Sequence, residues 1–250
     1  MDWPAKIAWD TPSGKIIQRV CSQVPSNNLA NILVFGSAAL QLTVTRDLLS
    51  ADVDLAVEYV NIAFNNNNLK ELRRVDLQNI VRKEGLAEGQ ANLFVQVCSS
   101  TAFETSPVWG RRAMTVKVGH VSLTIPHPFD ILIGKLHRLE SKDIEAFEMV
   151  IHATGHPTSE EFRQELQQCS RLFEPRSDDS LFPAQHNRSL FKYNVSKLWP
   201  KVFGKTISVS RDILEPINEL RANDYRPRKG GDLKKSLIKI KRHKRSTTNS

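Results

Sequence analysis

Two short stretches of the sequence carry residue types suited to phosphate and metal chemistry. Gly36 and Ser37 follow the apolar run 31–35, where a strand would turn into a helix, so backbone N–H groups and the helix dipole would face an anion. Asp52 and Asp54 stand two residues apart on an extended stretch, where both carboxylates would point to one side. Magnesium is commonly held by one or two such carboxylates together with substrate phosphates. The two stretches predict a phosphate site beside a magnesium site.

A mixed set of strands and helices is needed to bring these residues together. Apolar runs and alternating patterns predict strands at 31–35, 51–59, 92–97, 113–118 and 121–125, the last two joined as a hairpin. Apolar residues at three- and four-residue steps predict helices at 12–24, 38–49, 69–84, 129–151 with a break near Ser141, 158–173, 186–202 and 209–223. We therefore expect an α/β fold in three parts: a mixed sheet flanked by helices over 1–155, a helical segment over 156–225, and a basic tail over 226–250.

The order of strand, Gly36-Ser37, helix and a strand bearing Asp52-Val53-Asp54 resembles the signature of the nucleotidyltransferase superfamily. A second stretch, Val121–Glu145, is similar to the segment that follows the catalytic strands in AbiE-type toxins and related minimal nucleotidyltransferases. In that group a Pro-led turn precedes a helix with a Lys-Leu pair, and a basic residue followed by Asp comes next. The resemblance covers residues 30–150 approximately and implies a nucleotidyltransferase-like mixed sheet.

This resemblance implies an enzyme that transfers a nucleoside monophosphate from an NTP to a hydroxyl group, on an RNA such as tRNA or on a protein. Asp52 and Asp54 would be the catalytic residues and would hold magnesium as the cofactor. The residues implied in nucleotide binding are Gly36, Ser37, Arg46, Lys135 and Asp143. Similarity to the toxins also implies an antitoxin as a partner.

One position departs from the family pattern. Active members usually carry a third carboxylate on a later strand, and Gln96 stands there in this chain. An amide has no negative charge and cannot accept a proton at neutral pH, so two-metal catalysis would be weakened. Three interpretations stay open: another acid such as Glu104 or Asp130 substitutes, the enzyme works slowly with two carboxylates, or the fold binds nucleotide or RNA without turnover.

Several of these residues also have ordinary structural explanations. Lys135 could be a solvated surface lysine, and Asp143 an acid favoured by the dipole at a helix N-terminus. His152 and His156 have the spacing of a metal-binding pair on a helix, but the glycine and proline beside His156 indicate a helix end and favour a structural role.

The positive charge of the chain is concentrated at its C-terminal end. The formal net charge is +8, yet Arg226–Arg245 contains ten basic residues and one acid, which leaves 25 basic against 26 acidic residues elsewhere. A segment of this kind neutralises phosphates and binds nucleic acid without reading its sequence. A solubilising tail is the alternative. Beside a nucleotidyltransferase body, we expect it to hold an RNA acceptor such as tRNA.

Composition and cysteine spacing exclude several classes. With 40% hydrophobic and 25% charged residues, the chain resembles folded proteins rather than disordered ones. Cys21, Cys98 and Cys169 are far apart, which argues against a disulfide framework or a cysteine zinc site. We see no targeting segment and no apolar stretch near the roughly 18 residues of a membrane span. We expect a cytoplasmic protein without a membrane partner.

Overall fold

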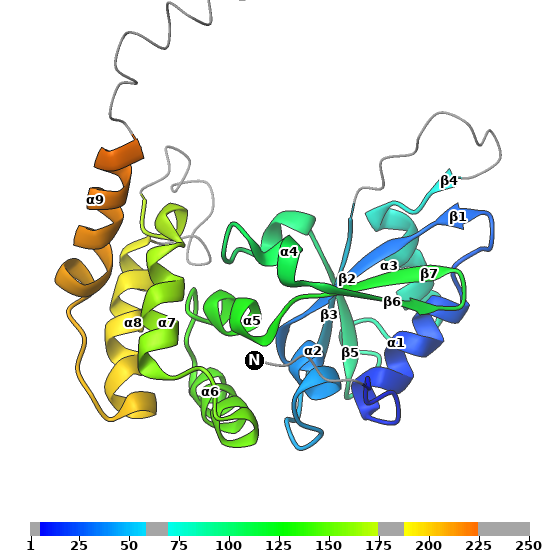
Figure 1. The fold of residues 1–250 in the computed structure, drawn as a ribbon. Helices are drawn as coiled ribbons and strands as arrows, with labels where there is room; N and C mark the ends of the chain where they lie inside the picture. Colours follow the sequence, from blue (N-terminus) through cyan, green and yellow to red (C-terminus); the bar gives the residue numbers. More distant parts are fainter. Residues whose placement is uncertain (1–5, 59–69, 175–187, 225–250) are drawn as a thin grey trace, which may run out of the picture.

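The computed structural model describes residues 6–58, 70–174 and 188–224, so the predicted tail lies outside the described residues (Figure 1). A mixed sheet forms the centre of the first part of the chain. Its strands, in spatial order, are β5 (Phe94–Cys98), β3 (Asp52–Val57), β2 (Asn31–Phe35), β7 (Val121–Ile125) and β6 (Met114–Val118). β2 is antiparallel to β3 and parallel to β7, while β3 and β5 are parallel. The prediction of an α/β fold with a mixed sheet is confirmed.

Two smaller pairings complete the strand structure. β6 and β7 form the predicted antiparallel hairpin, and its turn contains Gly119 at a φ of +60°. A separate parallel pair joins β1 (Asn28–Leu29) to β4 (Lys70–Glu71).

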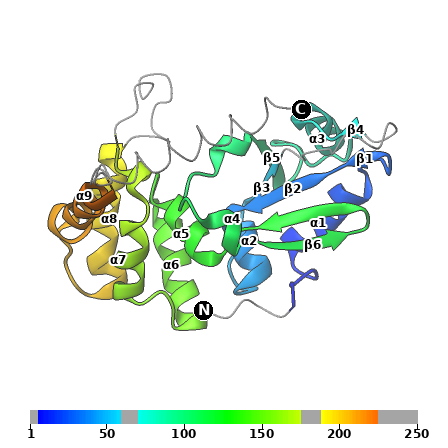
Figure 2. The same cartoon turned by 45° about the horizontal axis from the view of Figure 1, so that its top comes forward.

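Helices flank the sheet and then continue beyond it. Those that accompany the sheet are α1 (Pro12–Ser22), α2 (Gly36–Thr43), α3 (Arg74–Lys83), the 3-10 turn η1 (Ser100–Ala102), α4 (Trp109–Arg112), α5 (Pro128–Lys135) and α6 (Ser141–Thr154). Those that follow are α7 (Ser159–Gln167), the 3-10 turn η2 (Ser170–Leu172), α8 (Arg188–Phe203), the π-helical turn η3 (Val209–Leu214) and α9 (Glu215–Asp224). Figures 1 and 2 show α7, α8 and α9 lying together, with α5 and α6 between them and the sheet.

One continuous set of buried side chains connects the sheet with the later helices. β2 is buried at four consecutive positions because it lies between β3 and β7. Further along, the ring of Phe147 on α6 meets Phe162 on α7 edge-on, with centroids 5.4 Å apart, and Phe162 stacks on Trp199 of α8 at 5.9 Å. The predicted boundary at residue 155 coincides with Gly155, the left-handed C-cap of α6, although the core is shared across it.

Two predicted helices are wrong in their limits. The helix expected over 38–49 ends at Thr43, because Thr43, Val44 and Thr45 form a run of β-branched residues that disfavours helix, and the chain continues as an irregular loop. The helix expected over 69–84 begins only at Arg74, since Lys70–Glu71 pairs with β1 and Asp76 caps the helix through the backbone N–H of Arg73.

No helix in the described ranges has both the length and the apolar character that crossing a membrane requires.

Candidate functional site

A cavity of about 920 Å³ lies where the sheet meets α5 and α6. Its walls are the turn between β2 and α2, one face of β3 and β5, the loop that follows α2, and the facing sides of α5 and α6. The predicted site residues that line it are Gly36, Ser37, Asp52, Asp54 and Lys135. The fold therefore brings together most of the residues selected from sequence, although they come from three separate stretches.

Gly36 and Asp54 are in direct contact. Gly36 has a φ of +69°, in the left-handed region, and a Cβ placed on it would lie 2.4 Å from Oδ2 of Asp54. The antiparallel register of β2 and β3 causes this approach because it pairs Phe35 with Asp54. Glycine is thus required for two reasons, its backbone conformation and the carboxylate that covers it.

Asp52 and Asp54 form a concentrated negative charge on one face of β3, as the strand alternation predicted. Desolvation by burial, followed by repulsion from Asp52, raises the pKa of Asp54 to about 6. Of the neighbouring cations, Lys135 forms an ion pair with Asp143, and Arg138 forms ion pairs with Glu140 and Asp143. Among the residues that the structure describes, neither Asp52 nor Asp54 has an ion-pair partner. A divalent cation would relieve their repulsion.

Lys135 is held by two hydrogen bonds at the cavity wall. Its Nζ donates to Oγ of Ser37 and to Oδ1 of Asp143, each at 2.9 Å. Its side chain is only 8% exposed, so the solvated-surface interpretation of Lys135 is wrong. The ammonium group is therefore fixed beside the Gly36-Ser37 turn, where an anion would bind.

Asp143, the second partner of Lys135, lies inside the protein rather than on the cavity wall. It is fully buried (0% exposed), does not line the cavity, and Oδ2 accepts the backbone N–H of Glu140 at 2.9 Å as part of a capping box. Burial opposes its ionisation, but Lys135, the backbone N–H of Glu140 and Arg138 together outweigh burial, so the pKa of Asp143 is lowered. Asp143 is therefore both an acid in the first turn of α6, as one interpretation expected, and the ion-pair partner of Lys135. It would affect a bound nucleotide through Lys135 rather than by direct contact.

Arg46 is not brought to the cavity. Its guanidinium pairs with Asp10 at 2.5 Å, and the two side chains are 61% and 63% exposed. The reason is the early end of α2 at Thr43, which places Arg46 on the outer side of the loop that follows. The structure therefore does not support the predicted role of Arg46 in nucleotide binding.

Gln96 occupies the position expected for the third carboxylate. The parallel register of β3 and β5 pairs it directly with Asp54, and its side chain is exposed on the cavity wall. Cys98, two residues later on the same face, lies with Sγ 3.8 Å from Oδ1 of Asp54. The strand predicted over 92–97 is therefore present beside β3, and it places the amide of Gln96 opposite Asp54.

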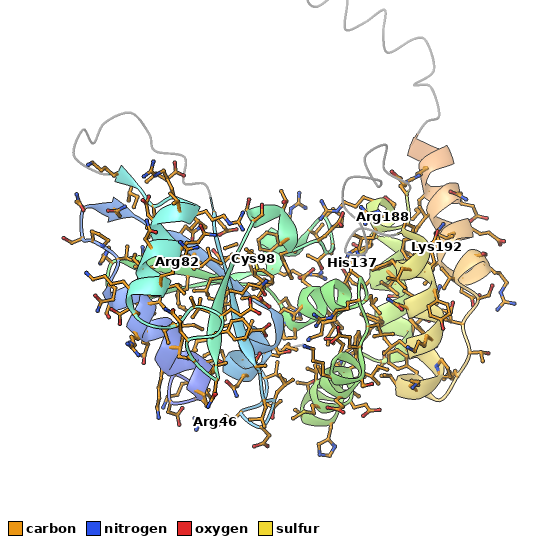
Figure 3. The ribbon with its side chains drawn as sticks, turned by 180° about the vertical axis from the view of Figure 1, so that it is seen from behind. Arg46, Arg82, Cys98, His137, Arg188 and Lys192 are labelled. Atoms are coloured by element: carbon orange, nitrogen blue, oxygen red, sulfur yellow. The ribbon has the colours of Figure 1, made fainter. Side chains whose placement is uncertain are left out.

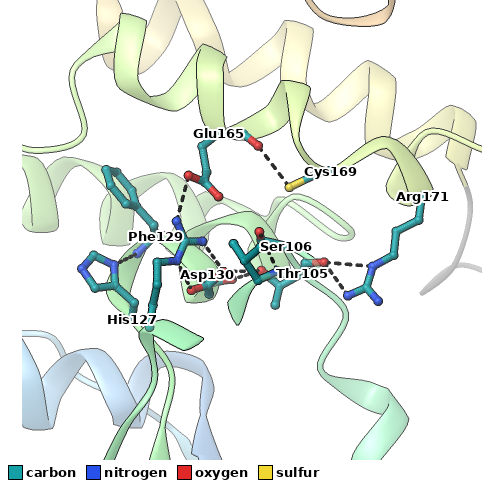
Figure 4. Close-up of polar contacts among 10 residues, drawn as sticks. Thr105, Ser106, His127, Phe129, Asp130, Glu165, Cys169 and Arg171 are labelled. Carbon is teal, nitrogen blue, oxygen red and sulfur yellow. Dashed lines mark hydrogen bonds and ion pairs between the residues drawn. The ribbon is translucent and has the colours of Figure 1, made fainter. Parts of the chain in front are cut away.

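The two acids considered as replacements are both engaged elsewhere. Glu104 lines the cavity, but its Oε1 lies 2.6 Å from Nη2 of Arg188 on α8. Asp130 is fully buried and accepts two hydrogen bonds from Arg112, at 2.7 and 3.1 Å (Figure 4). Asp130 does not line the cavity. Of these two acids, only Glu104 is placed where a substrate could meet it.

A magnesium ion at this site would depend on few protein ligands. Across the described parts of the chain, no three His, Cys, Asp or Glu side chains are grouped so that they could hold a metal ion. The protein contributes the carboxylates of Asp52 and Asp54. This oxygen donor set fits magnesium, which usually completes its coordination with water and substrate phosphates.

Several residues that line the cavity were not among the predicted site residues, although the sequence pattern could have indicated some of them. Ile131, Gly134, Lys135 and Arg138 all line the cavity at three- and four-residue steps, so the helical periodicity that places Lys135 could have placed Arg138 beside it. Cys98 follows Gln96 at strand spacing. His137 on the helical side and Cys98 on the sheet side are marked in Figure 3. Phe103, in an irregular segment, had no such signal.

His152 and His156 are not placed as a pair. α6 ends at Thr154, and Gly155 follows with a φ of +72°. His152 is exposed, while Nδ1 of His156 lies 2.9 Å from Oε2 of Glu161 on α7.

No protein-family model matches the chain, and neither a curated protein nor a solved structure matches it. Its function is therefore inferred from the geometry of the cavity.

Proposed function

We propose that the protein is a magnesium-dependent nucleotidyltransferase, which moves a nucleoside monophosphate from an NTP to a hydroxyl group on RNA, such as tRNA, or on a protein. The observation that carries this proposal is the convergence of Gly36, Ser37, Asp52, Asp54 and Lys135 on one cavity. An anion-binding turn, a buried lysine and a carboxylate pair are the groups that binding of a metal–triphosphate requires. The cavity volume, about 920 Å³, is in the range of nucleotide-sized ligand sites.

Each of these side chains has a defined task in the proposed reaction. The backbone at Gly36-Ser37 and the ammonium group of Lys135 hold the triphosphate, which fixes the α-phosphorus in front of the acceptor. The acceptor oxygen forms a bond to the α-phosphorus, the bond from that phosphorus to the bridging oxygen breaks, and pyrophosphate leaves. Gln96 cannot take up the hydroxyl proton, which passes to water.

Asp52 and Asp54 would hold magnesium in this scheme. A bound magnesium ion stabilises the negative charge that develops on the phosphate oxygens and on the leaving group. The raised pKa of Asp54, about 6, is consistent with a carboxylate pair whose usual counter-charge is a bound cation.

Label transfer tests this function directly. The full chain is incubated with magnesium and each α-labelled NTP, alone, with total tRNA, and with a protein extract, and label on the acceptor is measured. We expect transfer by the natural chain and its loss in Asp52→Asn. Asp10→Asn is the matched control because Asp10 is an exposed acid paired with Arg46 outside the cavity. Absence of both transfer and NTP binding, or equal transfer by Asp52→Asn, would refute the proposal.

A second candidate function is supported by Gln96. Because this amide faces Asp54 across the β3–β5 register, the domain could bind NTP or RNA without turnover. In that case, NTP binding that depends on Asp52 would be found without label transfer. Gain of transfer in Gln96→Asp would then locate the missing activity at this position, while an inactive variant would indicate a broader loss.

A further inference from the structure

The charged residues of α8 are all basic. Residues 188–211 contain six basic residues and no acidic one, although the chain outside Arg226–Arg245 has 25 basic against 26 acidic residues. Arg188 is buried against Glu104, whereas Lys197 and Lys201 are exposed. Among the residues that the structure describes, neither of these lysines has an ion-pair partner. The surface of α8 therefore presents uncompensated positive charge.

An exposed tyrosine lies on the same side of α8 as these lysines. Tyr193, Lys197 and Lys201 follow at four-residue steps, so they lie along one side of the helix, and we call them the α8 strip. The side chain of Tyr193 is 63% exposed, while every other Phe, Tyr or Trp in the described ranges is buried or half-buried. An aromatic ring beside cations is the arrangement on which the bases of a single strand stack.

The α8 strip begins beside the cavity. Leu190, one turn before Tyr193, lines the cavity. Nδ2 of the buried Asn194 donates to the carbonyl oxygens of Leu136 and Arg138, at 2.9 and 3.1 Å, which fixes α8 against the end of α5. From Leu190 the strip continues along the helix for about 16 Å. A strand bound along it can therefore reach the cavity with its end.

Two further cations line the cavity itself. Arg138 and Lys142 have side chains that are 57% and 55% exposed, and both pair with the exposed Glu140. Together with Lys135 they share two carboxylates, those of Glu140 and Asp143, so this part of the wall keeps a net positive charge. Positive charge is thus present both where the triphosphate would bind and along α8.

We propose that the α8 strip binds the single-stranded end of an RNA acceptor, with a base stacked on Tyr193 and backbone phosphates at Lys197 and Lys201. This inference rests on the proposed function and selects RNA rather than protein as the acceptor. The terminal hydroxyl would enter the cavity past Leu190. An RNA duplex suits the strip less well, because its bases are stacked on one another and are not free to stack on a side chain.

The ring of Tyr193 distinguishes RNA from an acidic protein, which positive charge alone would also attract. The face of an aromatic ring carries partial negative charge, so it gives a carboxylate no favourable contact. A base of any type gains from stacking on the same face. The combination of ring and lysines therefore favours RNA.

Binding of a short unstructured RNA to the full chain, without NTP, tests the stacking. A labelled oligonucleotide of about twelve nucleotides is compared with one in which abasic sites replace the bases. We expect Tyr193→Ala to weaken binding of the RNA by about fivefold or more and to leave binding of the abasic strand unchanged. Tyr193→Phe keeps the ring and should bind like the natural chain. The basic segment Arg226–Arg245 would contribute equally to both strands, so the comparison isolates the ring.

Salt dependence tests the lysines. Each phosphate that is neutralised on a single strand contributes about −0.7 to the slope of log affinity against log salt concentration. Replacing Lys197 and Lys201 together by Gln should reduce the size of this slope by about 0.7 for each lysine. Lys192→Gln is the matched control, because Lys192 follows Leu190 by two residues and so lies about 200° around the helix from it. This control should change the slope little.

The possible results separate this inference from the proposed function. Equal RNA binding by Tyr193→Ala and the natural chain, or an unchanged slope in the double lysine variant, overturns the α8 strip as an RNA site. Binding of polyglutamate that falls in the double variant while RNA binding does not would assign the strip to an acidic protein instead. All three results leave Asp52-dependent NTP binding standing. RNA binding that depends on the strip, without label transfer to any acceptor, would support the strip and count against the proposed function.

Discussion

The ammonium group of Lys135 donates a hydrogen bond of 2.9 Å to Oγ of Ser37, which connects the end of α5 to the start of α2. The same ammonium lies 2.9 Å from Oδ1 of the buried Asp143. Lys135 therefore has two separable contributions: it presents a positive charge at the proposed phosphate site, and it neutralises a carboxylate inside the protein. Mutations that remove one contribution and restore the other can distinguish them.

Lys135→Met should weaken NTP binding and also destabilise the fold. Loss of a charge-assisted hydrogen bond to phosphate corresponds to about 1.5–3 kcal/mol, or roughly ten- to a hundredfold in affinity. Asp143 would remain buried without its lysine, at a cost of about 3 kcal/mol or more. Adding Asp143→Asn should recover most of the stability but none of the affinity. Titration with magnesium–NTP and denaturant unfolding measure the two effects.

Arg46→Met is the matched control for this experiment. Arg46 is a cation near the site in sequence, yet it is exposed and pairs with Asp10 outside the cavity. We expect NTP affinity within about twofold of the natural chain and little change in stability. A loss of affinity as large as that of Lys135→Met would contradict the placement of both residues.

Gly36→Ala should weaken magnesium-dependent NTP binding by more than the backbone strain at residue 36 alone would explain. A left-handed φ costs a non-glycine residue about 1–2 kcal/mol, and the new Cβ would also lie 2.4 Å from Asp54 Oδ2, so the carboxylate must move. Gly155→Ala supplies the control, since Gly155 has a φ of +72° but no atom within 4 Å of an added Cβ. We expect both variants to lose stability and Gly36→Ala alone to lose magnesium-dependent NTP binding. Equal NTP binding by the two variants would show that the Asp54 contact is unimportant.

The parts of the site that could be predicted from sequence are those set by local periodicity. Strand alternation placed Asp52 and Asp54 on one face, and the apolar run before Gly36 placed the turn. Arg46 lies outside the cavity, which the sequence did not indicate, because the end of α2 depends on how the loop after Thr43 packs. The Glu104–Arg188 pair joins residues 84 positions apart, and no periodic pattern relates an irregular segment to the start of α8. Contacts of this kind come from tertiary packing alone.

His127 should make stability depend on pH below neutrality. Its Nδ1 accepts the backbone N–H of Phe129 at 3.2 Å as the N-cap of α5, which requires an unprotonated nitrogen. Desolvation by burial, and then the charge of Arg112, lower the pKa of His127 from 6.5 to about 4. Between these values the unfolded chain binds a proton that the folded chain excludes, so stability falls as the pH falls, by up to about 3 kcal/mol.

His127→Asn tests this contribution, because Asn also caps helices but does not titrate. Denaturant unfolding of both chains at pH 7.5 and pH 4.5 gives the comparison. We expect the natural chain to lose more stability between these pH values than the variant does. Identical losses would mean that His127 does not carry the predicted pH dependence.

Arg112 connects the start of α5 with α7, and its removal should destabilise the protein in a pH-dependent way. Its guanidinium lies 2.7 Å from Oδ1 of Asp130 and 2.8 Å from Oε2 of Glu165 (Figure 4). Arg112→Leu would leave Asp130, which is fully buried, without its cation, at a cost of about 3–5 kcal/mol.

The buried carboxylate sets the sign of this pH dependence. Burial raises the pKa of Asp130 to about 6 although the charge and hydrogen bonds of Arg112 lower it. Loss of Arg112 should therefore raise this pKa further. At pH 8 the variant must fold around an ionised, unpaired carboxylate, whereas at pH 5 Asp130 binds a proton and the penalty shrinks. The stability difference between Arg112→Leu and the natural chain should therefore be larger at pH 8 than at pH 5. Adding Asp130→Asn should remove most of that difference at pH 8, and failure of this rescue would show that Arg112 stabilises the fold by packing rather than by charge.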